Sequence, residues 1–199
     1  MNSKAERKSR SHGAILDAAA AFVRRSGIAG ARIADVMSDA GLTVGGFYAH
    51  FSSKDDLIAE TLRRAAGENR ALLLQRIDEK PADKRAEVIL KRYLSAAHRD
   101  EVARGCPLPA VVGEIGTTAP EHAHVLADVI DENIDAIAPH LPKGHALSKR
   151  SLALALIALM YGGLSLSRAL KGTPLSDEVL RACRAVGIGI LEQQPKDRA

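Results

Sequence analysis

The segment from Thr43 to Lys54 concentrates side chains that can bind an anionic partner. It contains the hydroxyl groups of Thr43 and Tyr48, the imidazole of His50 and the ammonium group of Lys54. Such groups donate hydrogen bonds to phosphate oxygens, and hydroxyl groups can also reach base edges. Elsewhere in the 199 residues there is no Ser/His/Asp set, no carboxylate pair and no phosphate loop at a catalytic spacing. The sequence therefore predicts a binding protein and not an enzyme.

Three helices are predicted to position these groups. Their expected ranges are 10–26, 33–40 and 43–50. Gly27 and Gly41 end the first two helical patterns, and Thr43 is a suitable N-cap for the third. Two short helices joined through a glycine after a longer helix are typical of a helix-turn-helix, whose last helix enters a major groove about 12 Å wide.

Gly45 and Gly46 lie inside this last predicted helix. A glycine there costs about 1 kcal/mol relative to alanine, which is tolerated where the backbone must approach a partner closely. The alternative is that the pair only forms a turn between two helices. Phe47 and Phe51 lie on one face of the segment, and we expect them in the core.

The charge distribution points to the same part of the chain. The whole sequence has a formal net charge of +4. Residues 1–54 carry eight basic and four acidic residues, so this segment accounts for the entire net charge. We expect residues 1–8 to form a basic N-terminal arm, and we expect the anionic partner to meet the N-terminal quarter.

The rest of the chain is also predicted to be helical, which gives an all-α fold of about nine helices. Apolar residues at helical spacing, bounded by Pro, Gly and Ser, predict helices at 54–78, 82–99, 120–137, 148–172 and 176–193. A further short helix is predicted after the breaker-rich loop 105–109 and ends at about Ile115. Ser53 is an N-cap candidate with Asp56 three residues later, as in a capping box. No run alternates with period 2 for long enough to predict a sheet.

Composition excludes several other classes. The two cysteines, Cys106 and Cys183, form neither a disulfide framework nor a zinc cluster. His122 and His124 lie two apart on a helix and so face different sides, which makes them poor joint ligands, and we expect no metal and no cofactor. There is no signal peptide, and the most apolar stretch, from Leu152 to Leu166, is shorter than the roughly 20 residues that span a bilayer. We expect a cytoplasmic protein with no membrane partner.

The segment from Ile33 to Leu57 resembles the signature of the TetR-like (TetR/AcrR) transcriptional regulators. The matching pattern is Ala-Gly-Leu-Thr, from Ala40, followed by Phe-Tyr-x-His-Phe-x-x-Lys-x-x-Leu, which ends at Leu57. This resemblance extends over about residues 9–69. It implies a helix-turn-helix DNA-binding domain over 9–69, sharing its long helix with a ligand-binding and dimerisation domain over 70–199.

The resemblance also implies roles for particular residues on double-stranded operator DNA. Thr43, Tyr48, His50 and Lys54 would contact phosphates or bases, and Val44 would pack on a thymine methyl. Gly45 and Gly46 would let the backbone approach the bases. Family members commonly have Ser or Thr at the start of the second helix, where this chain has Ala31-Arg32. Arg32 is then expected to supply the phosphate contact.

A homodimer through the last two helices is the second expectation. The segment from Leu152 to Met160 is apolar all round the helix, which requires burial on nearly every side. The predicted interface residues are Leu152, Leu156, Leu159, Gly163, Leu166, Val186 and Ile190. The alternative is a helix buried inside a monomer.

An effector site is the third expectation. Polar or soft groups in apolar surroundings could line a cavity for an unknown small molecule, although each could equally be an ordinary core or surface residue. These candidates are Tyr93, His98, Cys106, Glu114, Met160 and Tyr161. We expect a repressor that a ligand releases from its operator. The alternatives are a constitutive activator or architectural protein, and a redox or electrophile sensor that acts through Cys106.

Overall fold

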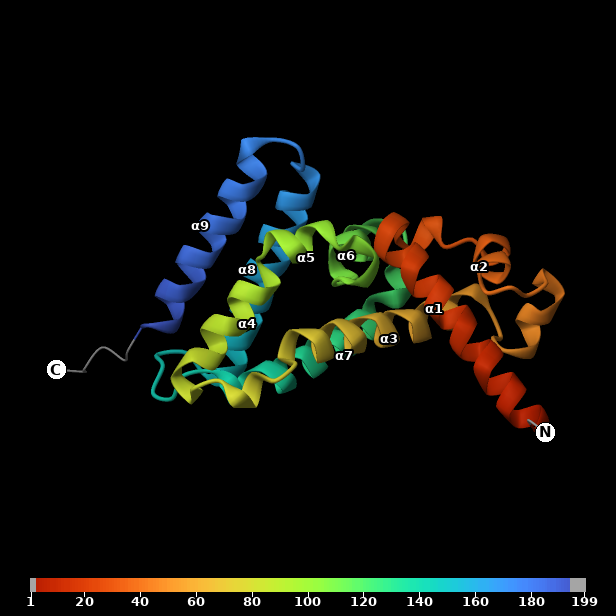
Figure 1. The fold of residues 1–199 in the computed structure, drawn as a ribbon, viewed down its shortest axis with the longest axis horizontal. Helices are drawn as coiled ribbons and strands as arrows, with labels where there is room; N and C mark the ends of the chain where they lie inside the picture. The colour runs from red at the N-terminus through yellow and green to blue at the C-terminus, as the bar shows by residue number, and fades with distance from the viewer. Residues whose placement is uncertain (1–2, 194–199) are drawn as a thin grey trace. The chain divides into compact units, whose positions relative to one another are not determined.

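The computed structural model describes residues 3–193, and every regular element in that range is helical (Figure 1). The predicted all-α class is confirmed, with nine α-helices and six short 3-10 helices among the described residues. The chain divides into two compact units. Unit 1 comprises residues 1–68 and 102–129, and unit 2 comprises residues 69–101 and 130–199.

Unit 1 contains the predicted helix-turn-helix. Its elements are α1 (Lys4–Gly30), α2 (Ile33–Asp39), η1 (Val44–Ala49), the first part of α3 (Lys54–Leu74), η4 (Val102–Arg104), α6 (Leu108–Thr117), η5 (Pro120–His122) and the start of α7 (Ala123–Ile137). Phe47 and Phe51 are buried in its core, as predicted, with their rings stacked 5.6 Å apart. Val111 and Ile115 of α6 join the same core. Residues 102–129 therefore pack with the N-terminal segment, although the sequence placed them with the body after residue 70.

The prediction of a basic arm over residues 1–8 is wrong for the part that the structure describes, because α1 begins at Lys4. Ser3 and Glu6 form a capping box: the Glu6 N–H donates to Ser3 Oγ, and the Ser3 N–H donates to the Glu6 carboxylate at 2.8 Å. This cap satisfies backbone donors that an uncapped helix end leaves free. The basic residues at 4–10 are thus held on a helix, and all of them are exposed.

Two other predictions in unit 1 need adjustment. Gly27 has φ 71, as a helix-ending glycine should, but a further turn continues to Gly30. The third helix of the motif is the 3-10 helix η1 and not an α-helix. Its backbone bonds join residues three apart, such as the His50 N–H to the Phe47 carbonyl at 2.9 Å. Gly41, with φ 70, ends α2 as predicted.

Unit 2 is built from the remaining helices. They are the end of α3, η2 (Ile77–Glu79), η3 (Ala82–Lys84), α4 (Arg85–Tyr93), α5 (Ala96–Asp100), the rest of α7, η6 (Ala138–His140), α8 (Lys149–Ala169) and α9 (Pro174–Leu191). The helix predicted at 82–99 is interrupted after Tyr93, because Ser95 caps a new helix through a hydrogen bond from the His98 N–H. The helix predicted at 54–78 ends at Leu74.

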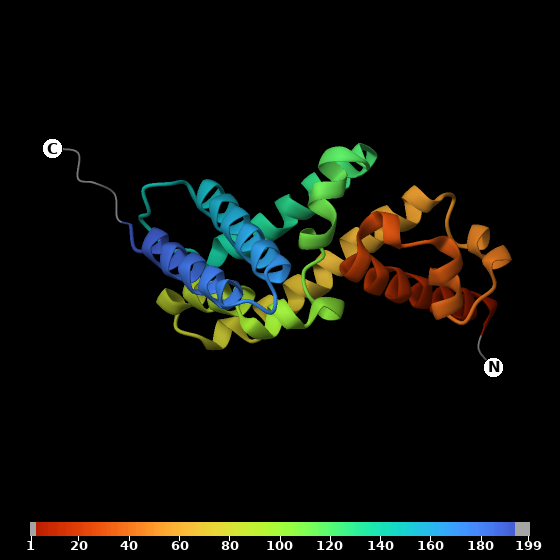
Figure 2. The same ribbon diagram turned by 90° about the horizontal axis from the view of Figure 1, so that it is seen from above.

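The last two long helices, α8 and α9, lie side by side in both views (Figures 1 and 2). Ser148 caps α8 as predicted, by accepting a hydrogen bond from the Ser151 N–H at 3.1 Å. By length and composition alone α8 could cross a membrane, but 44% of its most apolar window is buried inside the protein. The core helix of a soluble protein passes the same test, so this is weak support for a membrane span.

Candidate DNA-binding surface

The 3-10 helix η1 has one buried side and one exposed side. Phe47 is fully buried, which anchors the helix on the core, while the side chains of Tyr48 and Val44 are 74% and 52% exposed. Thr43 is also exposed. A large aromatic and a branched apolar side chain kept in water side by side are characteristic of a contact surface. Val44 and Tyr48 lie in η1, and Thr43 is the N-cap residue directly before it.

At both glycines of η1, an added β carbon would fit without a clash inside the described chain. A β carbon on Gly45 would meet nothing within 4 Å, and one on Gly46 would only touch Met37 and Thr43 at ordinary contact distance. Neither residue has a positive φ. Both lie inside η1, so the alternative of a simple turn between two helices is wrong. Open space at Gly45 is compatible with the predicted close approach of a partner to the backbone.

His50 ends η1 in a positively charged environment. Burial in the first place, and then the nearby charges of His12 and Lys8, hold the pKa of His50 below its ordinary value. His12 stacks on the Phe51 ring at 4.6 Å and hydrogen-bonds to Glu60 at 2.9 Å. A phosphate at this position would therefore meet several potential cations. Lys8 and His12 are not among the contacts predicted from the sequence, although their spacing of four residues places them on one face of a helix that starts early.

Lys54 is the first residue of α3. The N-terminus of this helix is capped as predicted by Ser53, whose Oγ accepts from the Asp56 N–H at 3.0 Å. The Asp56 carboxylate accepts from the Ser52 backbone, and not from the Ser53 backbone as in a strict capping box. The ammonium group of Lys54 belongs to this first turn of α3. Its charge therefore adds to the positive end of the helix dipole.

The other basic residues of the N-terminal segment are not all available. Arg32 is exposed at the start of α2 and makes no side-chain cap, in line with its predicted role as a substitute contact. Arg24, which contributes to the net charge of residues 1–54, is only 5% exposed. It donates to the Ala65 carbonyl at 3.0 Å and to the Glu68 carboxylate at 2.8 Å. The guanidinium group of Arg24 is therefore bound within unit 1 and is not available to an external anion.

The predicted effector residues do not form one cluster. Tyr93, His98, Met160 and Tyr161 lie in unit 2, whereas Cys106 and Glu114 lie in unit 1. Tyr93 and His98 are neighbours, with their rings edge to face at 4.7 Å and His98 Nδ1 2.8 Å from the Tyr93 carbonyl oxygen. Burial holds the pKa of His98 below its ordinary value.

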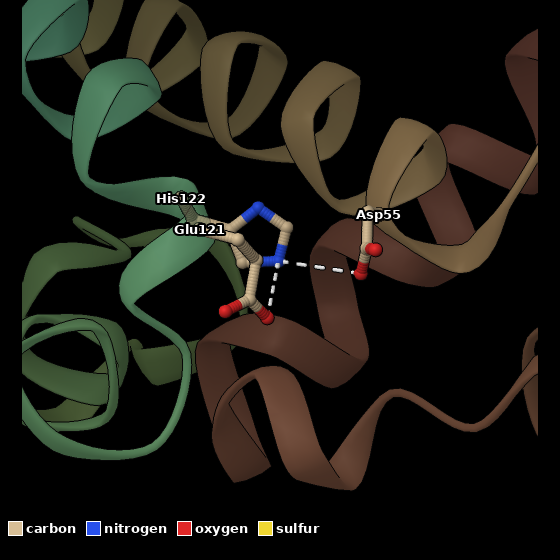
Figure 3. A group of neighbouring side chains, drawn as sticks. All are labelled: Asp55, Glu121 and His122. Carbon is tan, nitrogen blue, oxygen red and sulfur yellow. Dashed lines mark ion pairs between the residues drawn. The ribbon is translucent and has the colours of Figure 1, made fainter.

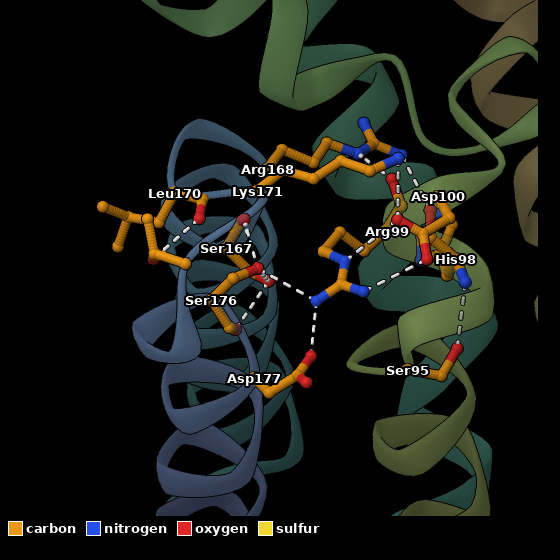
Figure 4. Close-up of polar contacts among 11 residues, drawn as sticks. Ser95, His98, Arg99, Asp100, Ser167, Arg168, Leu170, Lys171, Ser176 and Asp177 are labelled. Atoms are coloured by element: carbon orange, nitrogen blue, oxygen red, sulfur yellow. Dashed lines mark hydrogen bonds and ion pairs between the residues drawn. The ribbon is translucent and has the colours of Figure 1, made fainter.

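A polar network next to His98 ties three helices of unit 2 together (Figure 4). Arg99 of α5 donates to Ser176 Oγ at 2.9 Å and pairs with Asp177, both on α9. Ser167 of α8 donates to the Ser176 carbonyl oxygen at 2.8 Å, and both serines are buried. Asp100 pairs with Arg99 and Lys171, which lowers the pKa of its carboxyl to about 2.

Two of the predicted effector residues have other roles. Cys106 is 3% exposed, so its burial speaks against the alternative of an exposed sensing thiol. The Glu114 carboxylate is taken up by backbone N–H groups at the end of α1. Unit 2 does contain a pocket of about 120 Å³, but none of the six predicted residues lines it. Its lining residues are Ala82, Asp83, Lys84, Ala86, Glu87, His140, Pro142, Ile188, Leu191 and Glu192.

The predicted dimer residues divide into two groups. Leu152, Leu156 and Gly163 are buried within the chain itself, so their assignment to a dimer interface is wrong. The cause is that Leu152 and Leu156 contribute to the protomer core, and that Gly163 faces Cys183 and Leu94. The remaining residues are at least partly accessible, with Leu166 and Val186 more than half exposed; these are Leu159, Leu166, Val186 and Ile190.

Comparison with known proteins supports this architecture. Residues 15–61 match the family model described as bacterial regulatory proteins, tetR family. The search of curated proteins gives no match.

Solved structures extend the likeness to nearly the whole chain. A TetR transcriptional regulator from Chloroflexus aurantiacus is 26% identical, with a TM-score of 0.75 over 94% of this chain and 97% of its own. A TetR-family regulator from Cytophaga hutchinsonii is 21% identical, with a TM-score of 0.75 over 98% of this chain and 100% of its own. FadR from Bacillus subtilis, solved in complex with stearoyl-CoA, is 12% identical, with a TM-score of 0.65 over 89% of this chain and 98% of its own.

An N-terminal helix-turn-helix in an all-helical chain is an architecture that DNA-binding transcriptional regulators use. The family-model match over residues 15–61 and the likeness of the whole fold to TetR-family structures support a TetR-family regulator.

Proposed function

We propose that this protein is a repressor that binds operator DNA through η1 and the N-terminus of α3 and is released by a small molecule. The observation that carries the DNA contact is the exposed pair Val44 and Tyr48, on a helix whose Gly45 has open space around it. Arg32, Thr43, Gly46, His50 and Lys54 complete the proposed contact surface. The protein acts in this proposal by binding and not by catalysis, in the cytoplasm.

Electrostatics supports the same surface. The exposed N-terminal turns of α1 carry Lys4, Arg7 and Lys8, and Lys8 contributes to the positive environment of His50. Phosphate contacts from Lys and Arg release counterions and provide the sequence-independent part of the affinity. Tyr48, Thr43 and Val44 would then read base edges in the major groove.

A homodimer completes the proposal. The outward faces of α8 and α9 present apolar residues to water, with Leu154 and Leu166 on α8 and Val186 on α9 each about half exposed. Ala158 and Gly162 of α8 are small and exposed, which permits close packing of a partner helix. A symmetric pair of recognition helices would fit a palindromic operator.

The effector is proposed to act on unit 2. The relative FadR carries stearoyl-CoA in its structure, which shows that this fold can hold a small molecule. The pocket in unit 2, at about 120 Å³, is smaller than the roughly 300 Å³ of an ordinary ligand site. An effector of ordinary size would therefore have to open the helices around this pocket. A constitutive regulator without effector is the alternative.

Selection of an operator from random duplex DNA, followed by fluorescence anisotropy, tests the DNA contact. We expect Tyr48→Ala and Lys54→Ala each to weaken binding about tenfold or more, on the usual scale of one base or phosphate contact. Lys143→Ala is the matched control, because Lys143 is an exposed lysine in unit 2. Equal affinities of all three variants and the wild type would show that the contact surface lies elsewhere.

Sedimentation equilibrium tests the dimer. The double variant Leu166→Glu, Val186→Glu is expected to be monomeric, because it places charges on the proposed interface. Leu72→Glu is the control, since Leu72 is a similarly exposed leucine on α3. Dimers of unchanged stability in the double variant would contradict the proposed interface.

Screening a panel of metabolites tests whether a small molecule releases the protein from its operator. A ligand that binds the folded protein must raise its thermal midpoint, and a releasing ligand must also lower operator affinity. A 100-fold loss of affinity corresponds to a coupling of about 2.7 kcal/mol, which is within the usual allosteric range. Stabilising ligands that leave DNA affinity unchanged would favour the constitutive alternative.

A further inference from the structure

Three metal-ligating side chains from distant parts of the sequence meet in unit 1 (Figure 3). Asp55 lies in the first turn of α3, and Glu121 and His122 lie in η5. One ligand atom from each residue lies within 4.8 Å of the others. His122 Nε2 is 3.8 Å from a carboxylate oxygen of Asp55 and 3.8 Å from one of Glu121.

The buried imidazole is the informative member of this cluster. His122 is only 2% exposed, and its Nε2 has no hydrogen-bond partner among the described residues. A buried polar atom without a partner is costly and rare in native proteins. In Figure 3 this nitrogen points into the space between the two carboxylates.

A simple ion pair explains this geometry poorly. A charge-assisted hydrogen bond from a protonated imidazole to a carboxylate is about 2.7–2.9 Å long. Both nitrogen–oxygen distances are 3.8 Å, which leaves space between the groups. Zn²⁺ binds His nitrogen and carboxylate oxygen at about 2.0–2.2 Å, so two tetrahedral ligands lie about 3.4 Å apart. Each distance from His122 exceeds this spacing by about 0.4 Å, and the ligand atoms of the whole cluster lie within 4.8 Å of one another. Asp55 and Glu121 are exposed residues, so a change of side-chain rotamer can bring their carboxylates closer to a shared cation.

We propose that Asp55, Glu121 and His122 bind a divalent transition-metal cation, with Zn²⁺ as the best-fitting example. One imidazole and two carboxylates suit Zn²⁺ and its neighbours in the first transition row. Mg²⁺ and Ca²⁺ prefer all-oxygen sites with more ligands. Three protein ligands would leave the fourth tetrahedral position open to water.

The site connects to the DNA surface through the chain itself. Asp55 is the neighbour of Lys54, a residue of the proposed operator contact. A bound cation would offset the negative charge of Asp55 and tie the start of α3 to η5. This part of the inference rests on the proposed function, and it predicts that Zn²⁺ strengthens operator binding.

Titration of tag-free, chelator-stripped protein with Zn²⁺, in competition with a chromophoric chelator, tests the site. We expect one Zn²⁺ per chain with a dissociation constant in the micromolar range or below. Asp55→Asn and Glu121→Gln should each weaken binding at least tenfold. Both residues are exposed, so these variants should fold, and circular dichroism checks that they do. His122→Gln should abolish binding if it folds.

Asp35→Asn and Asp39→Asn are the matched controls, because both residues are exposed and lie outside the cluster. They should leave Zn²⁺ binding unchanged. Absence of saturable binding in the wild type, or equal affinity in Asp55→Asn and Glu121→Gln, would overturn the proposal.

Operator anisotropy with and without saturating Zn²⁺ tests the coupling separately. We expect tighter DNA binding with Zn²⁺ in the wild type and no change in Glu121→Gln. Zn²⁺ binding without any effect on DNA affinity would overturn the coupling and leave the metal site established. If no variant of the protein bound DNA at all, the proposed function would fail, while the direct titration would still decide the metal site.

Discussion

The backbone N–H of Ile28 donates a hydrogen bond of 2.6 Å to the carboxylate of Glu114. The Ala29 N–H donates to the same oxygen at 3.2 Å. Gly27, with its positive φ, turns the chain so that these two N–H groups face α6. One side chain of α6 thus satisfies the backbone just after the kink in α1, and residues far apart in the sequence become one structural unit.

Replacing Glu114 should destabilise unit 1. Glu114→Ala leaves two N–H groups without their partner, so we expect a loss of about 1.5–3 kcal/mol, the usual range for hydrogen bonds to a charged group. Glu114→Gln keeps one acceptor oxygen and should lose less. Urea denaturation measures both, with Glu101→Ala, at an exposed glutamate, as the control. Equal stability of Glu114→Ala and Glu101→Ala would show that the contact contributes nothing.

Gly27→Ala should also destabilise the protein, by about 2 kcal/mol or more, because a side chain is strained at positive φ. Its β carbon would in addition lie 2.2 Å from Glu114 Oε1. Gly113→Ala is the control, since that helical position has open space. Its expected gain is about 0.5–1 kcal/mol. Thermal unfolding compares the two, and a stable Gly27→Ala would contradict the kinked geometry.

Helix packing in unit 2 allows a matched pair of glycine substitutions. A β carbon on Gly163 would lie 2.9 Å from both Cys183 Sγ and Leu94 Cδ2, whereas one on Gly162 would meet nothing within 4 Å of its own chain. Gly163→Ala should therefore lower the stability of the protomer by about 1–3 kcal/mol through overpacking. Gly162→Ala should not lower protomer stability, and by the argument used for Gly113 it should raise it by about 0.5–1 kcal/mol, while it changes the dimer constant. Chemical denaturation measures protomer stability, and sedimentation measures the dimer constant. If Gly162→Ala destabilised the protomer and Gly163→Ala did not, the assignment of Gly163 to the protomer core and Gly162 to the dimer face would be wrong.

Stability should fall as the pH drops below about 6.5, partly because of His98. Burial lowers the pKa of His98 in the folded state, and the nearby Arg168 lowers it further. The unfolded chain then binds more protons than the folded chain between the two pKa values, so the free energy of unfolding rises with pH in that window. His98→Gln should flatten the dependence. Thermal midpoints between pH 5 and 7.5 measure it, and identical slopes in both proteins would remove His98 as a cause.

The salt dependence of operator binding should report on Lys54. Each phosphate contact contributes about 0.9 to the slope of log affinity against log salt, so Lys54→Ala should lower the slope by about 1.8 in a dimer. Lys143→Ala should leave it unchanged. Anisotropy titrations at several salt concentrations give both slopes, and a normal slope for Lys54→Ala would mean that Lys54 does not contact phosphate.

Local signals in the sequence determined the helices, several of their ends and the recognition motif. Ser148, Ser53 and Gly41 act within one or two helical turns, so their caps and stops could be predicted from neighbouring residues. The buried Phe47 and Phe51 followed from spacing on one helix face.

Only the tertiary structure decided which distant segments meet. Arg24 binds the carboxylate of Glu68, Gly163 packs against Cys183, and His122 lies beside Asp55. The same packing placed α6 with the N-terminal unit and split the predicted effector residues between two units. These contacts depend on how whole helices pack, which local periodicity does not encode, because it specifies the buried face of each helix but not its neighbour.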